Sequence, residues 1–254
     1  ILSSFNRAAK TYDQAAHLQR IVGEKLLSFL AEIKKPLKTI LDLGCGTGVI
    51  SAHLKKIYPD SSIFALDLAE NMVRLAQNKI AKEKLHWVVG DADFLPIKNN
   101  MLDLIVSNLM LQWINKLPNT LSQIHYALSK EGHFLCTTFA PGSLIEFLNA
   151  SQSVDSQPRI HPFLSKNELK KIFHEANFKI CHWEQDEYIE YYPDILAIMK
   201  KLKMLGATNA QTNRPNFLQT RNHFKKLAEA YEKFRTKTGL LPCTWQIYFF
   251  VLVK

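Results

Sequence analysis

One segment near the start of the chain, 39–48, limits its fold more than any other. Residues 39–43 are a short apolar stretch typical of a buried strand, and the loop that follows at 44–48 is Gly-Cys-Gly-Thr-Gly. Glycines let a backbone turn sharply and approach a ligand closely. Apolar residues then recur at helical spacing over 50–57. A strand, a glycine loop and a helix in this order predict a nucleotide-binding α/β fold.

Strand and helix patterns continue to alternate along the first 140 residues. Short apolar runs separated by amphipathic stretches are typical of a parallel sheet with helices on both faces. With two later runs, we expect a mostly parallel sheet of seven strands, at 39–43, 62–66, 85–89, 103–107, 134–139, 178–188 and 244–253. A capping box, Ser165 with Glu168, predicts the start of a helix that runs to about Ala176. The chain is predicted to be a single domain, 1–254.

Helical patterns outside this core predict two covers. Apolar spacing over 13–32 predicts a helix, so we expect an N-terminal helical cap at 1–35. Two further helices are expected at 194–205 and 220–236, between the last two strands. We interpret 194–240 as a helical insertion that covers the substrate side of the sheet.

The composition excludes several classes of protein. Hydrophobic residues make up 47% of the 254 residues, yet no apolar run approaches the roughly 18–20 residues of a membrane helix. The four cysteines form no CxxC pair and the nine histidines show no ligand spacing, so we expect neither a metal site nor a disulfide framework. We expect a cytoplasmic protein with reduced thiols, without a secretory signal and without a membrane partner.

The expected strand ends carry polar residues that fit one cofactor. Asp42 lies two residues before the first glycine, Asp67 follows the second strand, Asp91 the third and Asn108 the fourth. In open α/β sheets, ligands bind at these carboxyl ends. The GxGxG loop with its preceding acid resembles motif I of class I S-adenosylmethionine-dependent methyltransferases. A nicotinamide-binding fold is the alternative, against which the glycine spacing and the Gly-Asp-Ala element at 90–92 argue.

This resemblance implies a Rossmann-like class I methyltransferase fold and a role for each strand end. Asp42 is expected to orient the loop or the ammonium group of S-adenosylmethionine, Asp67 to bind the ribose hydroxyls, and Asp91 to lie at the adenine amine. Leu68 and Met72 are expected to enclose the adenine ring. The expected cofactor-binding residues are Asp42, Gly44, Cys45, Gly46, Gly48, Asp67, Leu68, Met72, Asp91, Ala92, Asn108 and Leu109.

Segments along nearly the whole chain are similar to the malonyl-[acyl-carrier protein] O-methyltransferase family of biotin synthesis. They lie at 5–9, 12–13, 18–20, 107–109, 112–113, 202–209 with Arg214, 241–242 and 244–245. The most specific is Leu-Lys-x-x-Gly-Ala-Thr at 202–208, whereas Trp245 departs from the family pattern, in which tyrosine is expected. The resemblance implies methylation of the free carboxylate of a malonyl thioester, carried on an acyl carrier protein, to its methyl ester.

The implied reaction needs few catalytic groups. A malonyl carboxylate is ionised at pH 7, because carboxyl groups titrate near 4, and the cofactor's sulfonium is an activated methyl donor. Catalysis is then expected from orientation and exclusion of water, and we assign no catalytic acid or base. Arg214 and Tyr12 are the candidates to orient the substrate carboxylate, since a guanidinium can bind two oxygens and a hydroxyl can donate a hydrogen bond. Trp113 and Tyr192 are expected to be pocket walls.

The formal net charge of +9 indicates an acidic partner or a lysine-rich solvated surface. The family resemblance implies an acidic acyl carrier protein, which a positive rim would attract. The expected docking residues are Lys200, Lys201, Lys203, Arg221, Lys225 and Lys226. We expect no nucleic-acid partner, because lysines dominate and no arginine-rich run is present, and we expect a monomer.

Three alternatives remain open from the sequence. The first is methylation of a small acid such as aconitate, or of a quinone precursor. The second is a nucleic-acid methyltransferase, against which Ser-Asn-Leu-Met stands at 107–110 in place of an Asn-Pro-Pro-Tyr-like tetrapeptide. The third is a binding protein that keeps the fold, like the assembly factors of respiratory complex I, which resemble this chain at 123–126 and 244–248.

Overall fold

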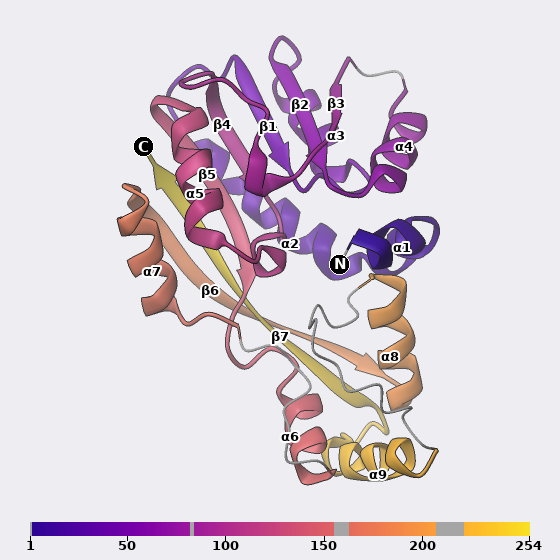
Figure 1. Ribbon diagram of the computed structural model, residues 1–254. Helices are drawn as coiled ribbons and strands as arrows, with labels where there is room; N and C mark the ends of the chain where they lie inside the picture. Colours follow the sequence, from indigo (N-terminus) through magenta and orange to yellow (C-terminus); the bar gives the residue numbers. More distant parts are fainter. Residues whose placement is uncertain (1, 82–83, 155–162, 207–220) are drawn as a thin grey trace.

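The computed structural model describes residues 2–81, 84–154, 163–206 and 221–254. Its strands are β1 (Thr39–Leu43), β2 (Ser62–Asp67), β3 (His86–Val89), β4 (Leu102–Ser107), β5 (Leu128–Phe139), β6 (Lys179–Tyr192) and β7 (Leu241–Val253). They form one sheet in the order β3-β2-β1-β4-β5-β7-β6 (Figure 1). β7 is antiparallel to both of its neighbours, and the other neighbouring strands are parallel. The expected mostly parallel, seven-stranded α/β sheet is confirmed.

Helices cover both faces of this sheet. They are α1 (Leu2–Ala15), α2 (His17–Ser28), α3 (Val49–Ile57), α4 (Glu70–Lys79), α5 (Leu117–Ala127), α6 (Ile145–Val154), α7 (Lys166–Glu175), α8 (Ile195–Met204) and α9 (Arg221–Tyr231). One core cluster joins α2 and α3 to Phe249 of β7, and the other joins α5 and α7 to Phe250. Successive side chains of a strand point to opposite faces, so β7 contributes to both clusters. None of the described helices has the length and apolarity to span a bilayer.

β6 and β7 extend past the rest of the sheet, and α6, α8 and α9 gather around their far end (Figure 1). Ile195 and Ile198 of α8 and Leu227 and Tyr231 of α9 are buried there, in the same cluster as Trp245 of β7. α1 lies between α4 and α8. α1 from the expected N-terminal cap and α8 from the expected insertion therefore contact each other, at the side of the sheet that carries the glycine loop.

The N-terminal helix differs from its prediction. One helix was expected at 13–32, but α1 begins at Leu2. The helix is interrupted at Ala16, which has φ −84° and ψ 34°, and α2 begins at His17. Ala15 and Ala16 are buried against Leu205, so a distant contact fixes the break. Tyr12, which lies just before the helix expected at 13–32, is therefore inside a helix, and the predicted start of that helix is wrong.

Three strands are longer than their apolar patterns. β5 starts at Leu128, six residues before the apolar run expected at 134–139, and continues through Glu131 at φ 58°. β6 continues to Tyr192, which pairs with Leu241 at the start of β7. The extra residues of β6 and β7 pair with each other, which explains the added length of these two strands. Local periodicity does not encode such pairing.

Candidate active site

The glycine loop connects β1 to α3 at the carboxyl edge of the sheet. Gly44, Gly46 and Gly48 have φ values of 79°, 52° and 81°, which L side chains rarely adopt. The Gly44 N–H donates to the carbonyl of Leu66 (2.8 Å), which fixes the loop to the end of β2. An added Cβ at Gly48 would lie 2.6 Å from Ile80, whereas at Gly46 it would meet nothing within 4 Å. Gly48 is therefore required for packing, and the space above Gly46 is open.

Asp67 ends β2 beside this loop. Its carboxylate accepts the N–H of Gly46 and the N–H of Ala69, both at 2.8 Å. Burial raises the pKa of Asp67, and these backbone hydrogen bonds oppose the rise. The Gly90 N–H donates to the Asp67 carbonyl (3.0 Å), so the end of β3 lies against the end of β2. The predicted neighbours Asp67 and the glycine loop are therefore in direct contact.

The remaining adenine-side candidates come after the ends of β2 and β3. Asp91 follows β3, and its carboxylate accepts the N–H of Asp93 (2.9 Å) at the start of η2 (Ala92–Phe94). Leu68 is 40% exposed, while Met72 is 1% exposed and packs against Ala9 of α1. Leu68 thus presents a free apolar surface at this edge, and Met72 lies under α1.

Asp42 points into the core rather than toward the open side of the loop. It is 1% exposed, and Ser51 in α3 donates a hydrogen bond to its carboxylate at 2.5 Å. Burial raises the pKa of Asp42 to about 7, against the effect of the Ser51 hydrogen bond. Its carboxylate contacts Ser51 of α3, so any effect of Asp42 on a ligand passes through the loop and this helix.

α1 lies across the loop and is attached by one carboxylate. Asp13 accepts hydrogen bonds from the Thr47 hydroxyl (2.7 Å) and from the Lys79 ammonium (2.8 Å). Burial pushes the pKa of Asp13 up, but these hydrogen bonds hold it below its ordinary value. The pKa of the neighbouring Tyr12 is raised by burial and by the carboxylate of Asp67. Tyr12 is therefore a protonated, enclosed hydroxyl close to Asp67.

A second attachment of α1 was not predicted from the sequence. The Asn6 side chain accepts the N–H of Asn71 (3.0 Å), and the Asn71 amide donates to the Asn6 carbonyl (3.1 Å). The N-cap residue of α4, Ala69, has no side-chain hydrogen bond of its own. Asn6 of α1 thus accepts a backbone N–H at the start of α4, which would otherwise lack a partner within its own helix. A contact between two helices of this kind leaves no local signal in the sequence.

The end of β4 is joined to α2 and β5. The Asn108 amide donates to the carbonyl of Gln19 in α2 (2.8 Å) and accepts the Thr137 hydroxyl (2.8 Å). Leu109 has φ 50°, and its N–H donates to the Thr137 hydroxyl (2.8 Å). A non-glycine residue at positive φ is uncommon and requires such support. Thr137 was missed by the sequence analysis and orients both predicted residues.

The substrate-side candidates do not form one group. Arg214 lies outside the described residues. Trp113 contacts Phe5 of α1 edge to face, with ring centroids 5.3 Å apart. The Tyr192 hydroxyl donates to Glu190 (3.0 Å), and both residues lie at the C-terminal end of β6. Within the described part of the chain, no group of three or more His, Cys, Asp or Glu side chains could hold a metal ion.

The expected docking lysines occupy different environments. Lys200 and Lys203 of α8 and Lys225 and Lys226 of α9 are exposed. Lys201 instead forms an ion pair with Glu190 (2.7 Å), with both side chains only 16% exposed. The side chain of Arg221 is outside the described residues.

The sheet order, with its antiparallel β7, and the loop with an acid at the next strand end define a Rossmann-like methyltransferase fold. A family model described as "Methyltransferase domain" matches residues 15–182. Among solved structures, a candidate methyltransferase from Bacillus halodurans superimposes with a TM-score of 0.65 at 17% identity, covering 91% of this chain and 98% of that one.

Curated relatives define the family more narrowly. The malonyl-[acyl-carrier protein] O-methyltransferase of Xylella fastidiosa is 36% identical, over 98% of this chain and 85% of the relative. That of Methylococcus capsulatus is 33% identical, over 96% and 89%. The chain therefore belongs to the malonyl-[acyl-carrier protein] O-methyltransferase family and is an S-adenosylmethionine-dependent O-methyltransferase of biotin synthesis.

Proposed function

We propose that this protein methylates the free carboxylate of malonyl-acyl carrier protein, using S-adenosylmethionine. The observation that supports this most is the similarity to relatives with that name over 96–98% of the chain. This similarity continues beyond residues 15–182, which the methyltransferase family model matches. The elements after residue 182 include the proposed cover of the substrate side, and a shared fold alone does not fix a substrate.

The described residues fit the cofactor. The open space above Gly46 lies next to the Asp67 carboxylate, which is placed to accept hydrogen bonds from ribose hydroxyls. We propose that Leu68 lies against the adenine ring and that Asp91 faces its amine. The cofactor supplies an activated methyl group, and α1 excludes water from it through the Asp13 and Asn6 contacts.

The substrate carboxylate needs orientation rather than activation. A tyrosine hydroxyl is protonated at neutral pH, and burial raises the pKa of Tyr12 further, so we propose that its hydroxyl donates a hydrogen bond to a carboxylate of the substrate or cofactor. We propose that Arg214 binds one oxygen of the malonyl carboxylate and leaves the other free to attack the methyl group.

Methyl transfer from labelled S-adenosylmethionine tests this proposal. Malonyl-acyl carrier protein, malonyl-coenzyme A, malonate and aconitate are compared, with Arg214→Ala and the control Arg74→Ala, an arginine 70% exposed on α4. We expect strong transfer to the carrier-bound substrate, lost only in Arg214→Ala. Transfer mainly to aconitate would favour the small-acid alternative. Tight cofactor binding with no transfer to any acid would refute methylation of malonyl-acyl carrier protein and favour the assembly-factor alternative.

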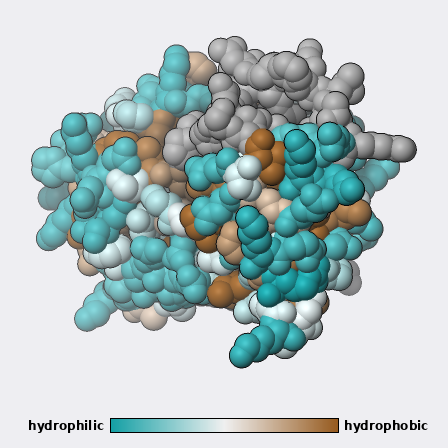
Figure 2. All heavy atoms as spheres, turned by 90° about the horizontal axis from the view of Figure 1, so that it is seen from below, coloured by the Kyte–Doolittle hydropathy of each residue, from teal (hydrophilic) through white to brown (hydrophobic). Residues whose placement is uncertain are grey.

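The exposed lysines suggest where the carrier protein binds. Figure 2 shows the end of the molecule near α6 and α9 as a mainly hydrophilic surface with separate apolar spots. We propose that Lys200, Lys203, Lys225 and Lys226 attract the acidic carrier, while Lys201 holds α8 on β6. Replacing Lys225 and Lys226 with glutamate should raise the KM for malonyl-acyl carrier protein about tenfold and leave that for malonyl-coenzyme A unchanged. Equal changes in both KM values would contradict this surface.

A further inference from the structure

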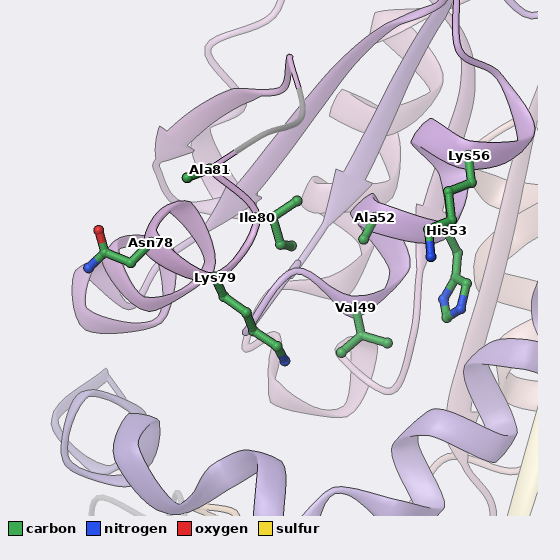
Figure 3. Close-up of a pocket in the computed structure, with 8 residues that line it drawn as sticks. All are labelled: Val49, Ala52, His53, Lys56, Asn78, Lys79, Ile80 and Ala81. Atoms are coloured by element: carbon green, nitrogen blue, oxygen red, sulfur yellow. The ribbon is translucent and has the colours of Figure 1, made fainter.

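A pocket of about 560 Å³ opens between α3 and the end of α4, and none of the predicted cofactor-binding residues lines it. Val49 and Ala52 of α3 and Ile80 form apolar parts of its wall (Figure 3). None of the residues labelled there is acidic. A volume of this size holds a small organic ligand, and the apolar wall suits a nonpolar ring or chain.

Three cationic or ionisable side chains line the same pocket. His53 and Lys56 come from α3, and Lys79 ends α4 (Figure 3). The His53 Nδ1 is buried and has no hydrogen-bond partner among the described residues. Lys56 makes no ion pair within the described ranges, and Lys79 is paired with Asp13 of α1 (2.8 Å). An anion in the pocket therefore meets the Lys56 ammonium without a competing carboxylate from the described part of the chain, whereas at Lys79 it shares the ammonium with Asp13.

We propose that this pocket binds a phosphate monoester. Its phosphate carries about −1.5 to −2 charge at pH 7 and is attracted by Lys56 and Lys79, while its organic part contacts Val49, Ala52 and Ile80. The chemistry of the lining favours this class, since lysine ammonium groups bind phosphate as point charges.

Occupancy of the pocket also loosens α1. Lys79 serves both the pocket and Asp13, so a bound phosphate competes with the Asp13 carboxylate for its ammonium group. Asp13 in turn holds Thr47 of the glycine loop (2.7 Å). The anion and the cofactor therefore weaken each other's binding by the same factor. This coupling rests on the proposed cofactor site, whereas anion binding does not.

Calorimetry with phenyl phosphate tests the pocket directly. We expect binding to the cofactor-free protein, about tenfold weaker in Lys56→Ala and unchanged in Lys98→Ala, which removes an exposed lysine elsewhere. Inorganic phosphate should bind more weakly than phenyl phosphate, because it leaves the apolar wall uncovered. No binding at millimolar concentration, or equal binding by both variants with unchanged thermal unfolding, would overturn the proposal.

A second titration tests the coupling. We expect saturating phenyl phosphate to weaken S-adenosylhomocysteine binding about threefold in the wild type and not in Asp13→Asn, whose neutral amide no longer forms the ion pair with Lys79. An unchanged affinity in the wild type would remove the coupling and leave the anion site. Absence of any S-adenosylhomocysteine binding would refute the cofactor site instead, while the phenyl phosphate titration still decides the pocket.

Discussion

Burial decides the chemistry of the two carboxylates closest to the glycine loop. Asp42 is enclosed between β1 and α3, with Ser51 as its hydrogen-bond donor. Asp67 is held by the N–H groups of Gly46 and Ala69 at the edge where a ligand can reach it. Two aspartates near the carboxyl ends of neighbouring strands therefore differ in role: Asp42 stabilises the loop from behind, and Asp67 faces the open space.

The titration of Asp42 should make the cofactor-free protein less stable as the pH rises from about 4 to about 7. Its folded-state pKa of about 7 lies above the ordinary value of 3.8, so the folded protein binds more protons than the unfolded chain in this window. The contribution at its steepest is roughly 1.4 kcal/mol per pH unit. Urea unfolding between pH 4 and 8 measures it, and Asp42→Asn should remove it. Identical slopes for the two proteins would contradict the assignment.

Asp67→Asn should weaken S-adenosylhomocysteine binding about tenfold or more. Asparagine has one carbonyl oxygen in place of a carboxylate, so a charge-assisted hydrogen bond from a ribose hydroxyl is lost, and such a bond contributes about 1.5–3 kcal/mol. Calorimetric titration gives the affinity, and Asp60→Asn, an exposed aspartate, is the control. Unchanged affinity in a normally folded Asp67→Asn protein would exclude Asp67 from the cofactor site.

At the scale of elements, the start of α4 and the attachment of α1 depend on each other. Helix N-termini leave N–H groups without partners, and a capping side chain contributes about 1 kcal/mol. α7 obtains its cap locally from Ser165, as the sequence predicts. α4 obtains a partner for Asn71 from Asn6, 65 residues earlier.

Asn6→Ala should therefore lower the free energy of unfolding by about 1 kcal/mol. It should also speed hydrogen exchange in α1, because Asn6 holds that helix on α4. Lys10→Ala, at an exposed position of the same helix, should change neither quantity. If both variants behave alike, the Asn6 contact does not hold α1.

At the scale of the whole molecule, one largely buried ion pair attaches α8 of the helical insertion to the sheet. Glu190 of β6 accepts hydrogen bonds from Lys201 of α8 (2.7 Å), from the Tyr192 hydroxyl (3.0 Å) and from the Trp245 indole (3.1 Å). Trp245 also contacts Phe139 at the end of β5, with ring centroids 5.0 Å apart. Trp245, where the resemblance led us to expect tyrosine, thus has a side chain that donates to this carboxylate.

Lys201→Met should lower the free energy of unfolding by about 3 kcal/mol, because it leaves the Glu190 carboxylate buried without its cation. The double variant with Glu190→Gln should recover part of the loss, since no buried charge remains. Lys200→Met, one residue away and exposed, should change stability by less than about 0.5 kcal/mol. Chemical denaturation measures all three. Equal stability of Lys201→Met and Lys200→Met would show that the ion pair contributes nothing.

The parts of the candidate site that follow strands could be predicted, and those that cross between elements could not. Asp67 and Asn108 were found because each ends an apolar strand, and parallel strands bring such ends to one edge. Asp13 lies in a segment that resembles the family, and Thr47 lies in the glycine loop. Their contact was not predicted, because it joins residues 34 positions apart. The pairing of Lys201 was missed because helical periodicity does not show which charge turns inward.

The sequence by itself determined the local units: the succession of apolar strands along the chain, the glycine loop with φ values that require glycine, and the capped helix α7. Their causes are short-range, namely backbone sterics, helical spacing and adjacent hydrogen bonds. Tertiary structure alone decided the break at Ala16, the length of β6 and β7, and the pKa of Asp42. Each of these depends on burial or pairing with distant residues, and only the folded chain brings those residues within the few ångströms over which such interactions act.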